Sequence, residues 1–426
     1  MQQNGKEPSP ATKQRRTPGR AAFAFIFVTV MLDMLALGIM APVLPKLVVE
    51  FMHGDIAAAA TITGIFGFAW AAMQFFFSPV LGALSDRIGR RPVVILSNLG
   101  LGLDYVLMAL APNLVWLFIG RVVSGITAAT FSAAAAYIAD VSPPERRAAQ
   151  FGMLGAAFGL GFIIGPAVGG VLGSIDLRLP FWAAAGLSLA NAVYGFVVLP
   201  ESLPRERRAP FVWRTANPLG ALTLLRSHPV LIGLTAATVL MYLAHEALPS
   251  MFVLYTDYRY GWNENAVGLA LAAIGVSTTI VSAALIRPAV AHLGERRAMV
   301  LGLFSGGAGF AVYGLAQTGA LFLAGIPLVA LWGLAGPSMQ SIMTRHVGPS
   351  DQGKLQGALS SLRGITGMIG PLLFTQSFAM ALDAENGIDL PGAPYLLAAL
   401  LMVGALTLSW RATRPQGAAL SQETAD

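Results

Sequence analysis

Twelve apolar stretches, each about 20 residues long, follow one another along the chain and constrain its fold more than any other feature. A helix of that length crosses the hydrocarbon core of a bilayer and satisfies its backbone hydrogen bonds internally. The sequence therefore predicts an all-α membrane protein with twelve transmembrane helices. The predicted spans cover residues 23–47, 60–83, 93–112, 114–139, 149–173, 181–200, 229–255, 266–286, 298–316, 320–343, 355–381 and 395–411.

Basic residues gather on one side of these spans. The N-terminal arm, the tail and every second loop hold 22 of the 27 Lys and Arg residues, whereas the other side holds only Lys46, Arg178 and Arg259. Short loops rich in Lys and Arg stay in the cytoplasm, so we expect both termini to be cytoplasmic. The net charge of +6 is mostly this asymmetry, and we expect no nucleic-acid partner.

The two halves of the chain repeat each other weakly. Gly165-Pro166 in the fifth span recurs as Gly370-Pro371 in the eleventh, 205 residues later, and Arg90-Arg91 matches Arg296-Arg297 at an offset of 206. The expected organisation is a cytoplasmic N-terminal arm (1–22), an N-terminal six-helix half (23–200), a cytoplasmic linker (201–228), a C-terminal six-helix half (229–411) and a cytoplasmic tail (412–426). Parallel halves with a substrate site between them are one layout of membrane transporters.

The most informative polar segment is Gly82–Pro92, between the second and third spans. Its glycines allow a tight reversal and a close approach of helices, and Asp86 can lie near a helix N-terminus, where a carboxylate is favoured. Its arginines can pair with Asp140 or with lipid headgroups. The candidate gating residues are Gly82, Asp86, Arg87, Gly89, Arg90, Arg91 and Asp140. A basic membrane anchor is the alternative interpretation.

Glycines recur every four residues in the fifth span, at Gly161, Gly165, Gly169 and Gly173. Such spacing places them along one face of a helix as a bare stripe, which lets the backbone of a neighbouring helix come close. Pro166 adds a point where the helix can bend. Ordinary helix packing is the alternative explanation of this stripe.

Five ionisable residues lie well inside the spans: Asp33, Asp104, Arg121, Glu246 and Arg363. Each costs about 2.5–3.5 kcal/mol at a helix centre, so each has to be paired, hydrated or functional. Asp33 lies roughly 15 Å along the first span, near the midplane. A carboxyl group taken out of water can bind and release a proton near neutral pH, which makes Asp33 the first candidate for a site that binds protons and a cationic substrate. A static ion pair is the alternative.

Asp104 and Arg121 lie at similar depth on adjacent spans, and they either neutralise each other or relay a proton.

Together these motifs resemble those of one transporter family. The segments that carry the resemblance are Leu32-Asp33, Gly38–Pro45, Gly82–Pro92, Leu103–Tyr105, Gly120-Arg121, Ser124–Thr127, Ile138–Asp140, Leu293–Ala298 and Gly370–Phe374. In them the chain is similar to the major facilitator superfamily, and within it to the bacterial tetracycline-efflux group of drug/proton antiporters. The resemblance implies the major facilitator fold and assigns Gly82–Pro92 as a latch between the halves. It also identifies Gly161, Gly165, Pro166 and Gly169 as an antiporter motif, and Arg121 as a residue common in proton antiporters.

The second half departs from this group. Where tetracycline exporters commonly carry a histidine in helix eight and an aspartate in helix nine, this chain has Thr278 and Gly306. We expect the proton carrier to have moved to Glu246, with Arg363 as its partner; a purely structural pair is the alternative, as is a polar helix tip for His245. The proton-coupling candidates are Asp33, Asp104, Arg121 and Glu246. The substrate-binding candidates are Asp33, Gln74, Tyr137, Tyr242, His245, Glu246, Gln340 and Arg363.

These observations favour a secondary transporter rather than an enzyme. We expect it to export a hydrophobic or cationic drug, such as a tetracycline-like compound, in exchange for protons across the bacterial inner membrane. Proton-coupled or uniport efflux of a sugar or other metabolite is the alternative, and a non-transporting receptor would need an added soluble signalling domain. No Gly-rich run ends in Lys-Ser or Lys-Thr, as an ATP-driven pump would require, and no Cys/His set indicates a metal site. We expect a monomer without a cofactor, and magnesium only as part of a chelated substrate.

Overall fold

The computed structural model describes residues 20–128, 130–142, 144–209, 225, 229–348, 351–382 and 390–414. Within these ranges the chain is built of helices and contains no strand. Most of the predicted N-terminal arm (1–22), linker (201–228) and tail (412–426) lies outside the described residues.

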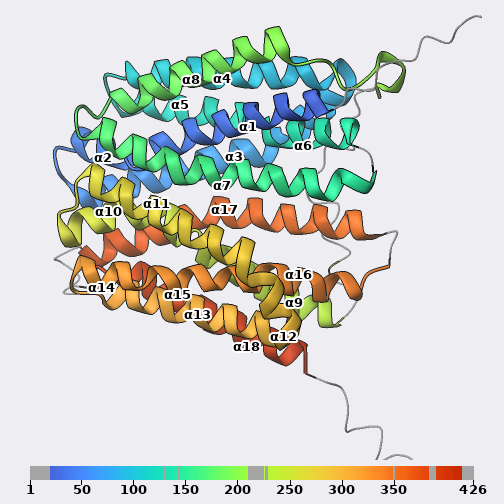
Figure 1. Ribbon diagram of the computed structural model, residues 1–426. Coiled ribbons are helices and arrows are strands. Elements are labelled where there is room, and N and C mark those ends of the chain that lie inside the picture. The colour runs from blue at the N-terminus through green and yellow to red at the C-terminus, as the bar shows by residue number, and fades with distance from the viewer. Residues whose placement is uncertain are drawn as a thin grey trace, which may run out of the picture.

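The first half of the chain forms the upper layer of helices in Figure 1. Its α-helices are α1 (Arg20–Met40), α2 (Leu44–Phe51), α3 (Ile56–Ile88), α4 (Arg90–Ala109), α5 (Leu114–Thr127), α6 (Thr130–Val141), α7 (Pro144–Gly173) and α8 (Leu179–Val198). A short 3-10 turn, η1 (Arg205–Arg207), follows α8.

The second half forms the lower layer of Figure 1. Its helices are α9 (Pro229–His245), α10 (Ala247–Tyr260), α11 (Glu264–Ile280), the π-helical turn η4 (Val281–Leu285), α12 (Ile286–Leu293), α13 (Glu295–Leu315), α14 (Gly319–Ala324), α15 (Ile326–Leu331), the 3-10 turn η5 (Trp332–Leu334), α16 (Ala335–Arg345), α17 (Gln352–Leu382) and α18 (Ala393–Ala412).

Eleven of the twelve predicted spans coincide with helices, in the described ranges, that are long and apolar enough to cross a membrane. The remaining span, predicted over residues 114–139, is made of α5 and α6, and α5 is apolar but only 14 residues long. Prolines interrupt several spans. Pro249, for example, has no N–H to donate to the carbonyl of His245, and the span therefore breaks between α9 and α10.

The two halves contact each other mainly through two pairs of helices, α3 with α17 and α7 with α11, and to a smaller extent through α10 with α2 and α3. Small residues allow the close approach: a Cβ atom on Gly268 would lie 2.3 Å from the carbonyl oxygen of Pro166, and one on Gly64 would lie 2.0 Å from Oγ1 of Thr375. Gly64 and Gly268 are 204 residues apart. The two contacts are therefore copies of one contact under the internal repeat, and they relate the halves by approximate twofold symmetry.

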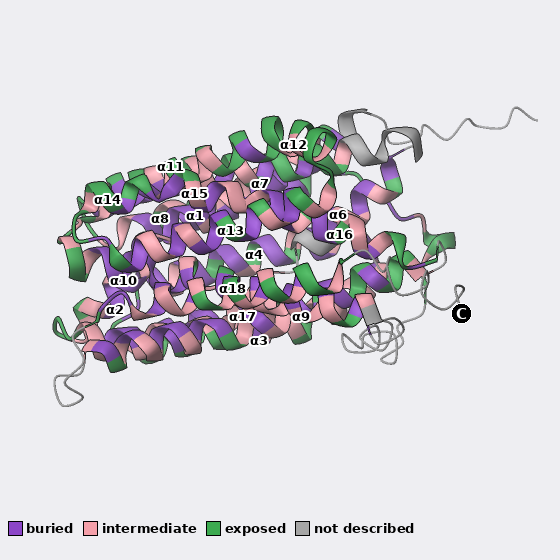
Figure 2. Cartoon of the chain, turned by 90° about the horizontal axis from the view of Figure 1, so that it is seen from below, coloured by how far each residue is buried: buried purple, intermediate pink, exposed green. Residues whose placement is uncertain are grey.

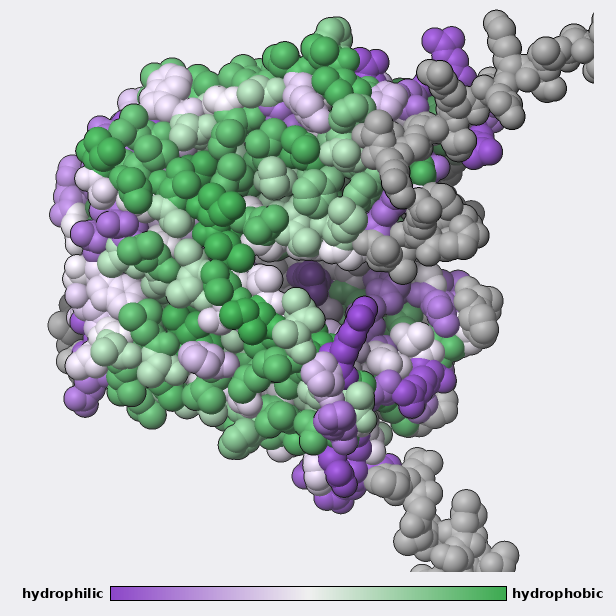
Figure 3. All heavy atoms as spheres, in the orientation of Figure 1, coloured by the Kyte–Doolittle hydropathy of each residue, from purple (hydrophilic) through white to green (hydrophobic). Residues whose placement is uncertain are grey.

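The halves meet at one end of the molecule and separate at the other. We call the end that carries the α3–α4 and α12–α13 turns the basic end, and the opposite one the Lys46 end. A Cβ atom on Gly170 would lie 2.5 Å from the carbonyl oxygen of Glu264 in the other half. Cβ atoms on Gly152 and Gly155, which lie nearer the basic end of α7, would have no atom within 4 Å. Figure 3 shows the resulting hollow, which opens between the layers at the basic end, on the right of the view, and has hydrophilic atoms in its depth.

The face of the molecule seen in Figure 3 is apolar over its middle. Figure 2 shows exposed residues along α11, α12 and α14, and large apolar residues such as Leu269, Leu293 and Leu321 are among them. Val197 and Phe304 are 73% and 63% exposed. A surface of this kind matches the hydrocarbon of a bilayer, and the chain is a multi-pass membrane protein.

We predict that Gly169→Val lowers the stability of the protein by about 1–3 kcal/mol, because a Cβ atom at Gly169 would lie 2.0 Å from the carbonyl oxygen of Ile39 in α1. The measurement is the thermal unfolding midpoint of the purified protein in detergent. Gly155→Val on the same helix is the matched control, and equal midpoints for the two variants would contradict the prediction.

Candidate functional site

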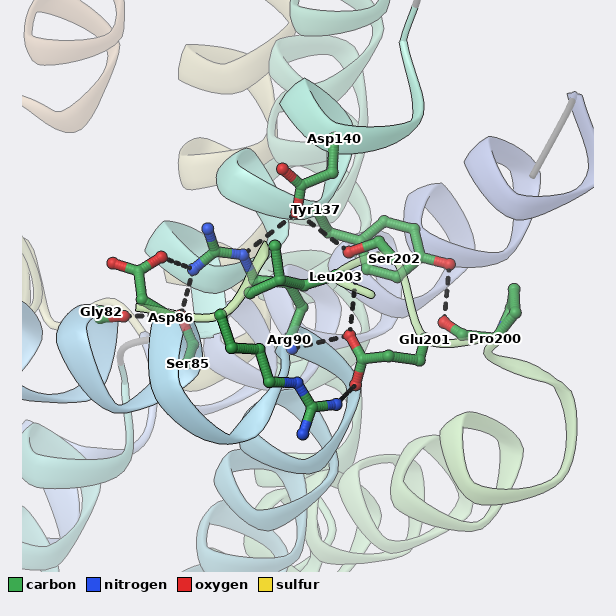
Figure 4. A network of polar contacts seen from close by, with 11 residues as sticks. Gly82, Ser85, Asp86, Arg90, Tyr137, Asp140, Pro200, Glu201, Ser202 and Leu203 are labelled. Carbon is green, nitrogen blue, oxygen red and sulfur yellow. Dashed lines mark hydrogen bonds and ion pairs between the residues drawn. The ribbon is translucent and has the colours of Figure 1, made fainter. Parts of the chain in front are cut away.

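A polar network at the basic end joins α3, α4, α6 and the segment after α8 (Figure 4). Arg90 is at its centre: Nη1 lies 2.6 Å from Oδ1 of Asp86 and donates to Oγ of Ser85 at 2.6 Å, while Nε donates to Oδ2 of Asp140 at 3.2 Å. Ser202 donates to the same oxygen of Asp140 at 3.1 Å. The network fixes the turn between α3 and α4 against α6.

Glu201 is a member of this network that sequence reasoning missed. Its Oε1 accepts hydrogen bonds from the backbone N–H groups of Arg90 at 2.9 Å and Leu203 at 3.0 Å, and its Oε2 lies 3.9 Å from Nη2 of Arg208. The carboxylate thus lies at the N-terminus of α4, where the helix dipole favours negative charge. We expected Asp86 in such a place, but Asp86 lies in the last turn of α3. The available signal was an acid directly after the sixth span.

The other candidate gating residues divide between the turn and the helix surface. Gly89 alone links α3 to α4, with φ of 112°, a conformation that favours glycine. Gly82 lies inside α3 and a Cβ atom there would touch nothing, so its expected role in a reversal is wrong. Arg87 is exposed, and the guanidinium of Arg91 lies 5.8 Å from the ring centroid of Phe196. All of these contacts lie within residues 82–209, and the latch between halves that the resemblance implies is not closed here.

The second half repeats this turn with the charges exchanged. Gly294 occupies the place of Gly89, with φ of 75°. Glu295 follows Arg90 by 205 residues and pairs with Arg345, which follows Asp140 by the same offset. The duplicated position therefore preserves the ion pair and reverses its polarity. The aromatic contact recurs as well, since the guanidinium of Arg296 lies 4.4 Å from the ring of Trp410 near the end of α18, just as Arg91 lies over Phe196 near the end of α8.

Asp33 lies inside the first half, 5% exposed, between α1, α4 and α8. Asn191 donates to Oδ1 of Asp33 at 2.8 Å and to the carbonyl oxygen of Thr29 at 2.9 Å. With its amide turned to satisfy both neighbours, Asn98 donates to Oδ1 and Oδ2 of Asp33 at 2.8 and 3.0 Å. Asp33 is therefore held by two carboxamides and does not reach the hollow in this conformation, contrary to the expectation that it lines the substrate site.

Asp104 and Arg121 are buried near each other, at 2% and 8% exposure, but they form no ion pair within 4 Å in the described part of the chain. Both carboxylate oxygens of Asp104 and Nε of Arg121 lack a hydrogen-bond partner there. The guanidinium of Arg121 instead lies 5.4 Å from the ring of Trp70. A direct ion pair, which one of the two interpretations requires, is therefore absent among the described residues, and Asp104 is a buried carboxyl group that accepts no hydrogen bond from them.

The glycine stripe of α7 faces α1, the helix that carries Asp33. Cβ atoms on Gly161 and Gly165 would lie 2.5 Å from Cβ of Met34 and 2.7 Å from Cα of Gly38. Gly38 faces back, since its own Cβ would lie 2.8 Å from the carbonyl oxygen of Gly161. Packing between α1 and α7 thus explains the stripe, while Pro166 and Gly170 on another face of α7 meet α11.

Glu246 lies at the break between α9 and α10 and packs onto α17. A Cβ atom on Gly370 would lie only 2.3 Å from Cβ of Glu246, so the glycine of the Gly370-Pro371 pair makes room for this side chain. The Glu246 side chain is 18% exposed, and its Oε1 lies 3.7 Å from Nδ1 of His245. Glu246 forms no ion pair with Arg363 within the described residues, so the expected partnership of these two residues is wrong for this conformation.

Arg363 and His245 each lie against an aromatic ring instead. The guanidinium of Arg363 lies 4.9 Å from the ring centroid of Tyr242, and the ring of His245 lies 5.5 Å from that of Trp332. Trp332 also explains why helix nine has no carboxylate: a Cβ atom on Gly306 would lie 2.9 Å from Cγ of Trp332 and 2.6 Å from Cε of Met402. An aspartate does not fit there unless Trp332 moves.

The remaining substrate-binding candidates separate into two groups. Gln340 is exposed and donates to Oε1 of Gln356 at 3.0 Å, and half-buried Gln74 lies on the face of α3 that carries Gly67 and meets α17. Tyr137 is fully buried, and its hydroxyl donates to the carbonyl of Pro200 at 2.9 Å. The expectation that Tyr137 lines the cavity is therefore wrong, because the residue anchors α6 at the basic end.

A second cluster missed by sequence reasoning connects the halves at the Lys46 end. Nζ of Lys46 in α2 lies 3.2 Å from Oδ1 of Asp257 and 3.3 Å from Oε1 of Glu264, and it donates to the carbonyl oxygen of Trp262 at 2.7 Å. The Lys46 side chain is only 10% exposed. One lysine of the first half thus bridges two carboxylates of the second, beside the tight contact of Gly170 with α11. Lys46 stood out in the sequence only as one of three basic residues on its side.

We predict that Lys46→Met weakens the contact between the halves at this end by on the order of 1–3 kcal/mol, because two partly buried carboxylates lose their shared cation. The chain contains no cysteine, so spin labels attached to Glu50→Cys and Arg259→Cys report the separation of the halves at the Lys46 end. The distance distribution is expected to shift to longer values in the variant.

Arg178→Met is the control for this measurement, since Arg178 donates to the carbonyls of Ala109 and Ala111 within its own half. It is expected to leave the distances unchanged. A Lys46→Met distribution that coincides with that of the unmodified chain would contradict the prediction.

The chain is similar to known membrane transport proteins in sequence and in structure. The profile of the Major Facilitator Superfamily matches residues 26–371. The chain is 37% identical over 367 residues to the tetracycline resistance protein of class C from Escherichia coli, covering 86% of this chain and 92% of the relative. It is 35% identical to the class B protein of Escherichia coli, over 84% of this chain and 89% of that one. Among solved structures, the human organic anion transporter MFSD10 has a TM-score of 0.67 at 23% identity, with 92% of this chain and 99% of that one covered.

Proposed function

The chain belongs to the Major Facilitator Superfamily, and we propose that it exports a hydrophobic or cationic drug, such as a tetracycline-like compound, in exchange for protons. The observation that carries this proposal is the hollow between the halves, which is closed by Lys46 and its carboxylates at one end and open at the other. Similarity to tetracycline resistance proteins over most of the chain supports the class of cargo.

The basic end faces the cytoplasm in this proposal, because Lys and Arg of short loops are retained there. The described conformation then receives cargo from the inside. Rocking of the halves about the α3–α17 and α7–α11 contacts would break the Lys46 cluster, open the opposite end and release the cargo outside. The polar turns at Gly89 and Gly294 would come together in that state and close the cytoplasmic side.

Proton exchange in this scheme uses carboxyl groups inside the spans. Asp104 is buried, at 2% exposure, and accepts no hydrogen bond from any described residue. Glu246 packs on Gly370, the point of α17 at which the exposed face of this helix becomes buried. Asp33 accepts hydrogen bonds from two carboxamides. These contacts favour Glu246 and Asp104 as groups that gain and lose a proton during the cycle, with Asp33 as a residue that holds α1, α4 and α8 together. A magnesium ion enters this scheme only as part of a chelated cargo. The transporter works as a monomer in this scheme, because a single chain contains both halves of the hollow.

We predict that Glu246→Gln and Asp104→Asn each abolish drug accumulation driven by a pH gradient, because neither amide can release a proton. The measurement uses inverted membrane vesicles that are acidified inside, where addition of a tetracycline or a cationic dye should release protons from the lumen. Glu50→Gln, an exposed carboxyl group on α2, is the matched control and should behave like the unmodified chain.

Asp33→Asn separates the two roles of a buried carboxylate. If Asp33 is structural, the amide should lower the stability of the protein more than it lowers the coupling of protons to drug in the molecules that remain folded. Absence of proton release across tetracyclines and cationic dyes with the unmodified chain would overturn the proposed function, and full activity of Glu246→Gln would remove Glu246 from it.

A further inference from the structure

One face of α17 runs from the interior of the second half into the hollow. Phe374 and Gly370 on this face are buried, whereas Arg363, Ser360 and Gln356, closer to the basic end, are exposed. Arg363 lies about 16 Å along the helix axis from the start of α17, at a rise of 1.5 Å per residue. An exposed guanidinium is therefore present deep within a membrane-spanning helix, on the face of α17 that also carries Ser360 and Gln356.

This guanidinium has no anionic partner in the described part of the chain. The guanidinium lies over the ring of Tyr242, 4.9 Å from the ring centroid. Its side chain donates no hydrogen bond to any other described residue, so its five N–H donors remain available. Glu246 follows Tyr242 by four residues, at the break between α9 and α10. It packs on Gly370 and lies beside His245 instead of pairing with Arg363. A cation at this depth requires water or an anion, and its planar fork matches the oxygens of a carboxylate or a comparable acidic group.

A second aromatic pair lies next to the first. Tyr242 and His245 are three residues apart on α9, so their side chains are neighbours on one face of that helix. The His245 side chain is 58% exposed and lies against Trp332, which is itself wedged against Gly306 and Phe310. Two flat aromatic surfaces thus lie beside one positive charge that has no anionic partner among the described residues.

We propose that Arg363 binds an ionised acidic group of the cargo, while the rings of Tyr242 and Trp332 receive a flat aromatic portion beside it. The inference rests on the proposed function. It narrows the substrate class to planar compounds that carry a delocalised anionic oxygen group, and these compounds can also carry positive charge elsewhere. Arg363 is then a specificity-determining residue. Glu246, which packs on Gly370 about two turns further along α17, is kept for the proton.

The experiment compares two probes that share a ring and differ in charge, 2-naphthoate and its uncharged amide 2-naphthamide. Binding to the purified full chain in detergent is measured by equilibrium dialysis, without a proton gradient. The unmodified chain is expected to bind naphthoate at least tenfold more tightly than naphthamide. Arg363→Gln should abolish this preference and leave naphthamide binding unchanged, and Arg363→Lys should retain part of it, because lysine keeps the charge and loses the fork.

Lys354→Gln on the same helix is the matched control, because Lys354 pairs with Asp351 near the start of α17 and lies away from the aromatic pairs. It should preserve the preference for naphthoate. Unchanged naphthamide binding by Arg363→Gln shows that this variant is folded. Equal binding of the two probes by the unmodified chain, or a preference that survives Arg363→Gln, would overturn the inference.

Failure of this inference and failure of the proposed function give different results. Preferential naphthoate binding that depends on Arg363, together with no drug-dependent proton release in vesicles, would remove proton-coupled drug export and keep the anion site. Proton release driven by cationic dyes, with no difference between the two naphthalene probes, would keep the exporter and remove the anion site.

Discussion

Close contact between helices at glycine positions is the constraint on which this architecture depends. The bare face of α7 lets α1 approach within van der Waals distance of its backbone, and Gly268 and Gly64 let α11 and α3 do the same with α7 and α17 across the two halves. Because these cross-half contacts run from mid-helix to the Lys46 end only, the halves diverge toward the basic end and enclose the hollow. In lipid, where apolar burial provides little drive for association, such packing largely decides which helices are neighbours.

The charges inside the membrane are distributed according to the same packing. Gly370 and Gly120 provide space for the side chains of Glu246 and Asp104, since a Cβ atom on Gly120 would lie 2.9 Å from Oδ1 of Asp104. Gly306 has no such space, because Trp332 fills it. Each half also locks its one-residue turn with an ion pair, Arg90 with Asp140 and Glu295 with Arg345. The two pairs have exchanged polarity, so the same turn is held by an ion pair of either sign in the two halves.

Apolar length and motif spacing predicted eleven of the twelve spans as helices long enough to cross a membrane, and they predicted that Gly89, Arg90 and Asp140 belong to the polar turn. They could not predict partners between helices, which depend on the rotation of each helix about its axis. Asp33 and Tyr137 are polar residues in spans, as predicted for a cavity wall, but both face the interior of their own half. Arg363 and Glu246 were expected to pair because their charges are opposite, yet Arg363 lies over the ring of Tyr242 and Glu246 packs against Gly370. Glu201 and Lys46 lie at span ends, where sequence offers many charged residues and no means of ranking them.

The sequence by itself determined that this chain is a duplicated set of membrane helices with one strongly basic side, because hydrocarbon thickness fixes the length of a span and a buried charge is costly wherever it falls. Only the tertiary structure decided which buried charges have partners, where the halves touch and which end is open. Those outcomes depend on contacts of a few ångströms between residues some 200 positions apart, such as Lys46 with Asp257 and Glu264, and no local pattern in the sequence specifies them.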